Sequence, residues 1–446
     1  MILQNWWLTT LLGIDYPITK PLNKNIHVDV LIIGGGMCGI SAANAFIGSG
    51  LKVVLVEKNI LGGSSTGKSA GFLTPDSELE LSQLIRRFGV EGAKEIWEVP
   101  CRGINKIVEN VQTYNLDCDL IKQDSLFVGI GKKGWEDVQA EVKSRTEVNL
   151  ESVIYTQSQL QQVFGGTGYN GAVRYANTYG IDALQYVQGM KKVLLDSGIQ
   201  TYESTTVTGI KGHTAHTHLG SVTADKIIIA IDKMENSFSS YAKEVFHAQT
   251  FLSISDPLSD KEIAQLFPTG EHFQCWDSTL VYSYYRLTGD KRILLGGGSV
   301  PTSFLPNAYN KPSVINDVIK SFKTHFNFLQ NLQFIQYWPG LIDTSRDLLP
   351  VIVKDPRAPN LHFVFGVVGL PWASFCGDFL ARDILSIAAA DEKKYYEYFC
   401  DRRYFFLPSG LSKLIGKPLL YAINNGWAKY YQVDKNHLPK YKKGEF

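Results

Sequence analysis

The sequence predicts an α/β protein: a parallel sheet entered through a glycine-rich turn, interleaved with an α+β part that contains a mixed or antiparallel sheet. Residues 28–33, VDVLII, form the continuous apolar run typical of a buried parallel strand. A glycine turn, a stretch with helical spacing (38–50) and a second apolar strand (52–59) follow, which together make one βαβ unit. Further along, residues 279–298 predict two strands joined at a Gly-Asp turn.

Length and composition narrow the class of protein. The 446 residues fit about two or three domains or interleaved lobes, and the net charge of +1 gives no electrostatic case for nucleic acid as a partner. The six cysteines contain no CxxC pair, so we expect neither a metal site nor a disulfide framework, and we expect a cytoplasmic location. No segment reaches the ~18–20 apolar residues that span a bilayer. The apolar N-terminus, MILQNWWLTTLLGIDYP, is interpreted as a packing arm rather than a signal peptide.

The first motif is the turn from Gly34 to Gly39, which has the spacing GxGxxG. Its first glycine permits a tight turn, the second lets the backbone approach a pyrophosphate, and the third lets the helix pack on the strand. Glu57 ends the next strand eighteen residues after Gly39, where an acidic side chain accepts hydrogen bonds from ribose hydroxyls. This Rossmann-type unit predicts the cofactor-binding residues Gly34, Gly36, Met37, Cys38, Gly39, Glu57 and Lys58.

A second loop, Leu61–Phe72, is long, small and rich in hydroxyl groups. Such a loop can lie flat against a pyrophosphate and a flavin ring, with Ser65 and Thr66 donating to phosphate. It therefore favours FAD over NAD as the dinucleotide, the alternative being a flexible surface loop. The candidate residues that it adds are Ser65, Thr66, Lys68, Ser69, Ala70 and Gly71.

With these motifs the sequence resembles the D-amino-acid-oxidase superfamily of FAD enzymes, and within it the branch containing gamma-glutamylputrescine oxidase. The first part of the resemblance is the glycine turn with its helix and the next strand, GGGMCGISAANAF and VEKN. The second is the segment STGKSAGFLTP, which is similar to the second glycine-rich loop of the family, often ASGRNGG. Lys68 and Ser69 stand where Arg and Asn are usual. The resemblance implies FAD, and non-covalent binding is expected because no cysteine stands in a recognisable attachment context; Cys376 is the alternative.

Two more segments complete the resemblance. The segment from Gly180 to Ile210 is similar to a helix-plus-strand unit whose valine, here Val207, contacts the adenine side; Ile231-Asp232-Lys233 departs from the usual Ala-Thr-Asn that follows. WPGLIDTSRDLLPVI with FVFGVVGLPWASFCGDFLA resembles the C-terminal flavin segment. A helix that begins near Gly369 with a proline in its first turn also presents N–H groups that stabilise a reduced flavin. The residues added are Val207, Gly340, Gly369, Leu370, Pro371 and Trp372, whereas Arg346 and Asp347 are expected to form salt bridges.

The substrate side is predicted from YSYYRLTGDKR. Along a strand, Tyr282, Tyr284 and Arg286 share one face. The resemblance places this strand over the flavin, so Tyr284 is the first candidate for the pocket and Arg286 the second, as a bidentate holder of a carboxylate. His272 and Trp276 are candidates for the same cavity. The alternative is a structural tyrosine ladder with a surface arginine.

The resemblance implies oxidation of the C–N bond of a small amine or amino acid, with hydride transfer to flavin N5 and hydrolysis of the imine. Leu294 and Gly298 replace a Lys and a His of the sarcosine-oxidase branch, which puts oxygen activation by such a lysine in doubt. One alternative passes the electrons to a membrane quinone or another carrier, with the apolar, Lys-bearing tail in weak contact with a membrane surface. Another is a non-catalytic FAD-bound scaffold. Oligomeric state is left open.

We expect the chain to alternate between two domains. Residues 1–27 form an N-terminal arm and 396–446 a C-terminal tail. Residues 28–76, 171–240 and 336–395 form three parts of the FAD-binding domain. The two intervening parts, 77–170 and 241–335, form the substrate domain.

Overall fold

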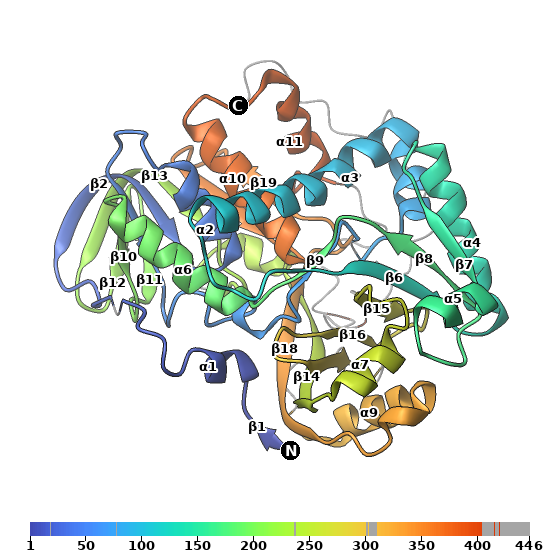
Figure 1. The fold of residues 1–446 in the computed structure, drawn as a ribbon. Helices are drawn as coiled ribbons and strands as arrows, with labels where there is room; N and C mark the ends of the chain where they lie inside the picture. The colour runs from blue at the N-terminus through green and yellow to red at the C-terminus, as the bar shows by residue number, and fades with distance from the viewer. Residues whose placement is uncertain are drawn as a thin grey trace.

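Two large β-sheets lie side by side in the computed structural model of the protein (Figure 1). The structure describes residues 1–17, 19–76, 78–235, 238–299, 302, 310–403, 414 and 419. An eight-stranded sheet lies on the left in Figure 1, and a nine-stranded sheet runs from the centre to the lower right. A three-stranded sheet, in the order β4 (Phe72–Leu73), β9 (Tyr179–Gly180) and β5 (Ile121–Lys122), completes the set.

The eight-stranded sheet is built around β2, as the apolar run predicts. Strands β3 and β13 pair with β2 in parallel on either side, and β10 extends the parallel part beyond β3. The inner side chains of β2 are fully buried on both faces, Leu31 on one and Ile32 on the other. The strands of this sheet are β2 (Asn25–Ile33), β3 (Val53–Val56), β10 (Gln200–Tyr202), β11 (Val207–Lys211), β12 (Thr214–Thr217), β13 (Ser221–Ile229), β19 (Val351–Lys354) and β20 (Leu361–Phe365).

The glycine turn joins β2 to helix α2 (Met37–Ala45) with no room for a side chain. Gly34 has a φ of +108°, and a Cβ there would stand 2.4 Å from the carbonyl oxygen of Ala230. A Cβ on Gly39 would stand 1.9 Å from the carbonyl oxygen of Gly34. The predicted βαβ unit is confirmed, and helices α10 (Leu370–Ile384) and α6 (Ala183–Asp196) pack against α2.

The nine-stranded sheet is mostly antiparallel, and the predicted hairpin around the Gly-Asp turn is present as β16 and β17. The apolar core on this sheet includes side chains from the helices α5 (Gln157–Val163), α7 (Asp260–Leu266) and α9 (Ser313–His325). In sheet order the strands are β1 (Ile2–Leu3), β18 (Phe334–Thr344), β14 (Phe246–Pro257), β17 (Arg292–Gly297), β16 (Tyr284–Leu287), β15 (Phe273–Asp277), β6 (Asp124–Gly129), β8 (Gly171–Tyr175) and β7 (Val153–Thr156).

The long element α3 (Leu81–Thr113) consists of two helices joined at a kink. Gly89 stands at the kink with a φ of +74° and a ψ of 174°, which are not helical angles, so the first helix ends at Phe88. A proline, Pro100, lies inside the second helix. The other α-helices of the described residues are α1 (Trp6–Thr10), α4 (Gly131–Glu147), α5 (Gln157–Val163), α7 (Asp260–Leu266), α9 (Ser313–His325) and α11 (Lys394–Tyr398).

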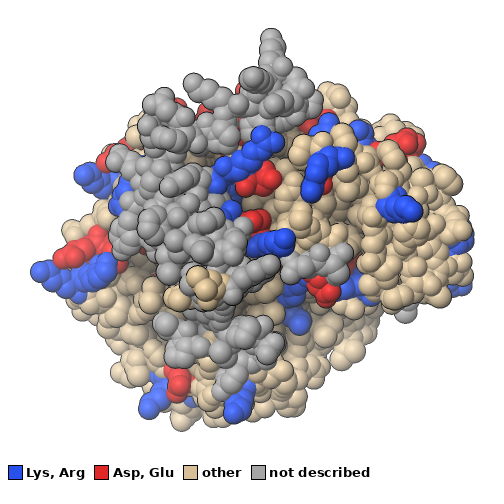
Figure 2. Space-filling model, turned by 180° about the vertical axis from the view of Figure 1, so that it is seen from behind, with Lys and Arg blue, Asp and Glu red and all other residues tan. Residues whose placement is uncertain are grey.

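The N-terminal arm packs on the protein, as expected. Its strand β1 pairs in parallel with β18, and Trp7 in helix α1 is only 2% exposed. The predicted C-terminal tail lies almost entirely outside the described residues. In the part of the chain that is described, no helix is both long and apolar enough to cross a membrane. The back face carries Lys and Arg interspersed with Asp and Glu (Figure 2).

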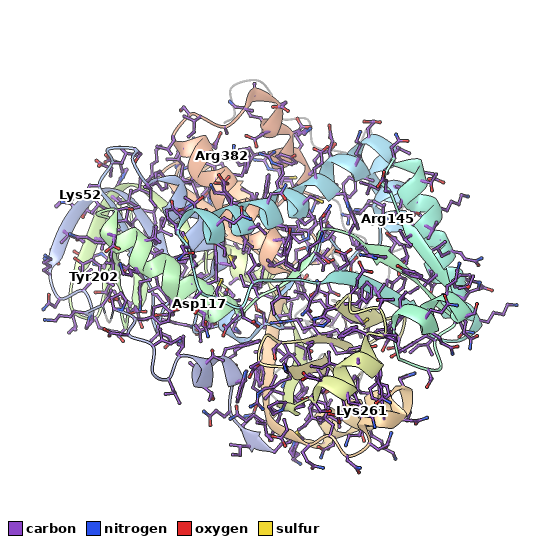
Figure 3. All side chains as sticks on the ribbon, in the orientation of Figure 1. Lys52, Asp117, Arg145, Tyr202, Lys261 and Arg382 are labelled. Carbon is purple, nitrogen blue, oxygen red and sulfur yellow. The ribbon has the colours of Figure 1, made fainter. Side chains whose placement is uncertain are left out.

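Buried ion pairs join the segment between β18 and β19 to α3 and to Arg403. Asp347, fully buried, accepts from Arg403 at 2.7 and 2.8 Å and from Arg87 of α3 at 2.5 Å. The prediction of a salt bridge for Asp347 is confirmed, and so is that for Arg346, which pairs with Glu244 at 2.8 Å. On α10, Arg382 (Figure 3) similarly donates to Asp378 and Glu392, at 2.7 and 2.5 Å.

We predict that Asp347→Asn destabilises the protein by about 3–5 kcal/mol, because it leaves two buried guanidinium groups without their carboxylate. The two arginines hold the pKa of Asp347 well below its usual range against the effect of burial. The contribution is therefore present above about pH 4 and is lost as the pH falls toward the folded-state pKa. Urea denaturation at pH 7 measures the loss. Glu109→Gln, which breaks an exposed pair with Lys106, is the matched control, and an equal loss in both variants would contradict the prediction.

Candidate functional site

A cavity of about 430 Å³ opens at the carboxyl ends of the parallel strands. Ile33 and Gly34 line it at the end of β2, Val56 and Glu57 at the end of β3, and Ala230 just after β13. Ligands of open α/β sheets bind at this edge, because the strand ends and the first turns of the following helices meet there. The βαβ unit therefore places the glycine turn, the helix start and Glu57 around one space.

The N-terminus of α2 points its first N–H groups at this cavity. Gly36 caps the helix with extended backbone and no side chain, and Met37 and Cys38 follow it on the cavity wall. Thr66 comes from the second glycine-rich loop, and its hydroxyl accepts from the N–H of Met37 at 3.0 Å. The positive end of the helix dipole and these N–H groups suit a diphosphate.

Glu57 lies where the turn and the second strand meet. Its carboxylate accepts from the N–H of Gly35 at 2.8 Å and from the N–H of Asn59 at 2.9 Å. Burial raises the pKa of Glu57 above its usual value, and the two N–H groups partly offset that effect. The side chain is thus held rigidly at the cavity wall, in the place where a ribose acceptor is needed.

A cluster of polar side chains lies in the middle of the site, between this cavity and a second one that is described below. Asp232 accepts from Ser64 at 3.2 Å, from Lys233 at 3.0 Å and, in a short hydrogen bond, from Ser65. Burial would raise the pKa of Asp232, but the Lys233 ammonium and these hydrogen bonds lower it overall. Sequence reasoning left the contacts of this segment in doubt. The structure brings it to the cavity wall, because Asp232 and Lys233 come three and four residues after strand β13.

The second cavity, about 270 Å³, continues from the first and shares Met37, Ser65 and Thr66 with it. On one side lies the loop Lys68–Phe72. On the other lies the start of α10, where Gly369 caps the helix and Pro371 stands in its first turn. A planar group in this cavity would lie between a loop rich in small residues and a helix N-terminus.

Aromatic side chains from the nine-stranded sheet form the far wall of the second cavity. Tyr284 shares a hydrogen bond with Thr250 at 2.9 Å, and the Tyr282 hydroxyl donates to Glu78 at 2.9 Å. Burial raises the pKa of Tyr284 to about 12 and that of Tyr282 well above 10. Both phenols are therefore neutral at physiological pH, and they can orient a substrate but cannot act as bases. Trp276 lies beside them.

Two acidic residues, Asp76 and Glu78, also line the second cavity, after the short strand β4. No arginine lines it among the described residues, and Lys68, an exposed side chain, is the one basic residue of the described wall. Besides burial, the negative charges of Glu78 and Asp76 raise the pKa of Tyr282. The wall is thus aromatic and acidic.

Most of the predicted cofactor-binding residues line a cavity, although their contacts with a cofactor stay predictions. In the first cavity they are Gly34, Gly36, Met37, Cys38, Glu57, Lys58, Ser65, Thr66 and Val207. In the second they include Lys68, Ser69, Ala70, Gly71, Gly340, Gly369, Leu370 and Pro371. Gly39 lies beneath the turn and packs the helix, as predicted. The expectation for Trp372 is not supported, because its ring is 1% exposed and packs edge-on against Phe399.

On the substrate side, the structure brings Tyr284 and Trp276 to the cavity but not Arg286 or His272. Arg286 is fully buried, and its guanidinium donates to the carbonyl oxygens of Ala70 at 2.7 Å and Ile181 at 2.8 Å, so the predicted role as carboxylate holder is wrong. His272 packs at a tilt against Phe267 and does not line the cavity. Cys376, the alternative for flavin attachment, is buried in α10 and lines neither cavity.

Several cavity residues were missed. Asp232 and Lys233 could have been found from their place three and four residues after a parallel strand, at the edge of the sheet where ligands bind. Asp76 and Glu78 carry no such signal, since only the path of the chain after β4 brings them to the wall.

The residues present fit FAD. A rigid carboxylate faces the ribose end, a helix N-terminus without a capping side chain faces the middle, and a small-residue loop opposite a second helix N-terminus faces the ring end. A Cβ on Gly36 would approach the Thr66 hydroxyl to 3.1 Å and fill the cradle.

Comparisons with known proteins agree with this site. The family described as "FAD dependent oxidoreductase" (DAO) matches residues 29–382. The gamma-glutamylputrescine oxidoreductase of Escherichia coli is 24% identical over 87% of this chain and 90% of its own. A probable oxidoreductase of Haemophilus influenzae, OrdL, is 24% identical over 78% of this chain and 80% of its own. The structure of glycine oxidase from Geobacillus kaustophilus has a TM-score of 0.68 at 15% identity, covering 82% of this chain and 96% of that one.

We predict that Glu57→Gln raises the dissociation constant for FAD about tenfold, because a charged acceptor becomes a neutral one. Fluorescence titration of the apoprotein with FAD measures the change. Asp225→Asn, an exposed substitution on β13, is the control. An unchanged affinity in Glu57→Gln would remove Glu57 from the ribose site.

Proposed function

The chain belongs to the DAO family of FAD-dependent oxidoreductases, and from this premise we propose that it oxidises the C–N bond of a small amine. The observation that carries the proposal is the second cavity, which continues from the cofactor cavity and has an aromatic, acidic wall. Relatives named for amine and amino-acid chemistry, a gamma-glutamylputrescine oxidoreductase and a glycine oxidase, support the reaction class. Amino-acid oxidation is the neighbouring alternative.

Bound FAD supplies the acceptor for the hydride that leaves the carbon next to the amine nitrogen, and water then hydrolyses the resulting imine. The protein has to hold that carbon in line and to keep water out. Tyr284 and Trp276, with Phe72 and Leu252, supply the apolar surface that does so. Because the hydroxyl of Tyr284 is neutral and hydrogen-bonded to Thr250, it can hold the nitrogen by a hydrogen bond but cannot remove a proton from it.

The charge of the wall favours an amine over an amino acid. A carboxylate substrate is best held by an arginine fork, and the guanidinium of Arg286 is turned away from the cavity. Asp76 and Glu78 instead attract a cation, so an amine with a second positive charge fits best. The preference for an amine therefore rests on the acidic pair, together with the burial of Arg286.

Two alternative functions would use the same FAD cofactor. A non-catalytic scaffold is excluded by membership in an oxidoreductase family. Transfer of electrons to a carrier other than oxygen stays a prediction. Leu294, which stands where the sarcosine-oxidase branch has a lysine, is buried in one cluster with Trp7 and Trp338 and lines neither cavity. The tail invoked for a membrane surface lies outside the described residues.

We predict that diamines bleach the bound FAD under anaerobic conditions, and that α-amino acids bleach it at least tenfold more slowly at equal concentration. The yellow absorbance of the flavin, followed in a stopped-flow instrument over diamines, monoamines, N-methyl amino acids and gamma-glutamyl amines, reports the rate. Faster bleaching by an α-amino acid would reverse the assignment. Readmission of oxygen then tests whether oxygen alone restores the colour.

We predict that Glu78→Gln raises KM for a diamine about tenfold and changes KM for an uncharged-tail monoamine much less. The amide oxygen keeps the hydrogen bond from Tyr282, so the substitution removes charge and little else. Steady-state kinetics with the two substrates measures the split. Glu91→Gln, on the exposed face of α3, is the control, and equal effects on both substrates would refute the role of the charge.

A further inference from the structure

The second glycine-rich loop is held from behind by the N-terminal arm. The side-chain amide of Asn5 donates to the carbonyl oxygen of Gly67 at 2.6 Å, and the indole N–H of Trp7 donates to that of Ser69 at 2.8 Å. Between them, the indole N–H of Trp338 on β18 donates to the carbonyl oxygen of Lys68 at 3.0 Å. Three consecutive carbonyl groups of the loop are thus bound on the side away from the cavity.

Arg286 holds the next carbonyl, that of Ala70, at 2.7 Å. Its guanidinium carbon also lies 5.6 Å from the centre of a Trp7 ring, so the arginine and the tryptophan support each other. This pairing explains why a fully buried arginine stands on a strand that was expected to face the substrate. Side chains of the arm and of β16 therefore bind carbonyl groups of the same short part of the loop.

The hydrogen bonds to these carbonyl groups fix the direction of the neighbouring N–H groups. In a trans peptide the C=O of one residue and the N–H of the next point in opposite directions. Since Trp7 binds the carbonyl of Ser69 and Arg286 binds that of Ala70, the N–H groups of Ala70 and Gly71 point away from both side chains. Ala70 and Gly71 line the second cavity, and no hydrogen bond to another described residue uses either N–H.

We propose that the N-terminal arm is a positioning element of the flavin site, in which Trp7, with Arg286, fixes two backbone N–H donors toward the ring of FAD. The arm precedes residues 29–382, which match the family, whereas Arg286 lies within them. Trp7 is a positioning residue: it lines neither cavity and acts only through the loop.

The chemical consequence follows from the charge of the cofactor. A flavin that has gained electrons carries more negative charge on its nitrogen and carbonyl atoms, and fixed N–H donors stabilise that form more than the oxidised one. Loosening the two peptides should therefore weaken FAD binding and make its reduction potential more negative. Neither effect depends on which substrate the protein oxidises.

The test is Trp7→Phe in the full-length protein, which keeps a ring beside Arg286 and removes the indole N–H. We expect the dissociation constant for FAD to rise about fivefold, the size of one ordinary hydrogen bond. We also expect the midpoint potential of bound FAD, measured by equilibration with a reference dye, to become more negative. Trp6→Phe is the matched control, because the Trp6 ring lies over Arg292 instead, at 4.6 Å from its guanidinium carbon.

Asn5→Ala is the second variant, expected to shift both quantities in the same direction by a smaller amount, and it serves alone if Trp7→Phe does not fold. Melting temperatures of the apoprotein distinguish an arm that only stabilises the fold, here called a brace, from one that positions the flavin site. If Trp7→Phe or Asn5→Ala lowers the melting temperature while the potential of bound FAD stays unchanged, the arm is only a brace and the proposal is wrong. Equal shifts of the potential in Trp6→Phe would overturn it too.

Discussion

The contact between Gly34 and the carbonyl of Ala230 is the constraint on which the cofactor site depends. Both residues follow parallel strands, β2 and β13, and they approach so closely that a single Cβ would stand 2.4 Å from the oxygen. Because the two strand ends are that close, the start of α2 lies over the edge of the sheet, and Glu57 on the neighbouring strand reaches the same space. Any side chain at this point would separate the strand ends and disperse the site.

The sequence predicts well what is local. The βαβ unit, the hairpin of β16 and β17 and the proline-started helix α10 each depend on neighbours in the chain, through apolar runs, turn residues and fixed backbone angles. Most of the cofactor candidates belong to these segments, so they reach the cavities where they are expected.

The positions of the remaining site residues depend on contacts with residues far away in the sequence. Arg286 alternates correctly along its strand, but its acceptors, Ala70 and Ile181, lie more than a hundred residues away, and nothing near Arg286 in the sequence announces them. Trp372 stands in the correct first turn of α10, but Phe399 draws its ring into the core. Glu78 reaches the wall through the path of a loop. In each case the rotation of one side chain depends on packing that composition and periodicity do not contain.

The pairing of the arm with β18 also sets an order in time. The arm is made before the strand and the tryptophan that receive it, because β18 and Trp338 come more than 300 residues later in the chain. Until then the loop at Gly67–Ser69 lacks part of its support. A nascent chain can therefore form its first βαβ unit early, whereas the completed cofactor pocket awaits synthesis of β18 and of α10, whose start lines the second cavity. Uptake of FAD in the cell would thus mark chains whose translation has passed α10.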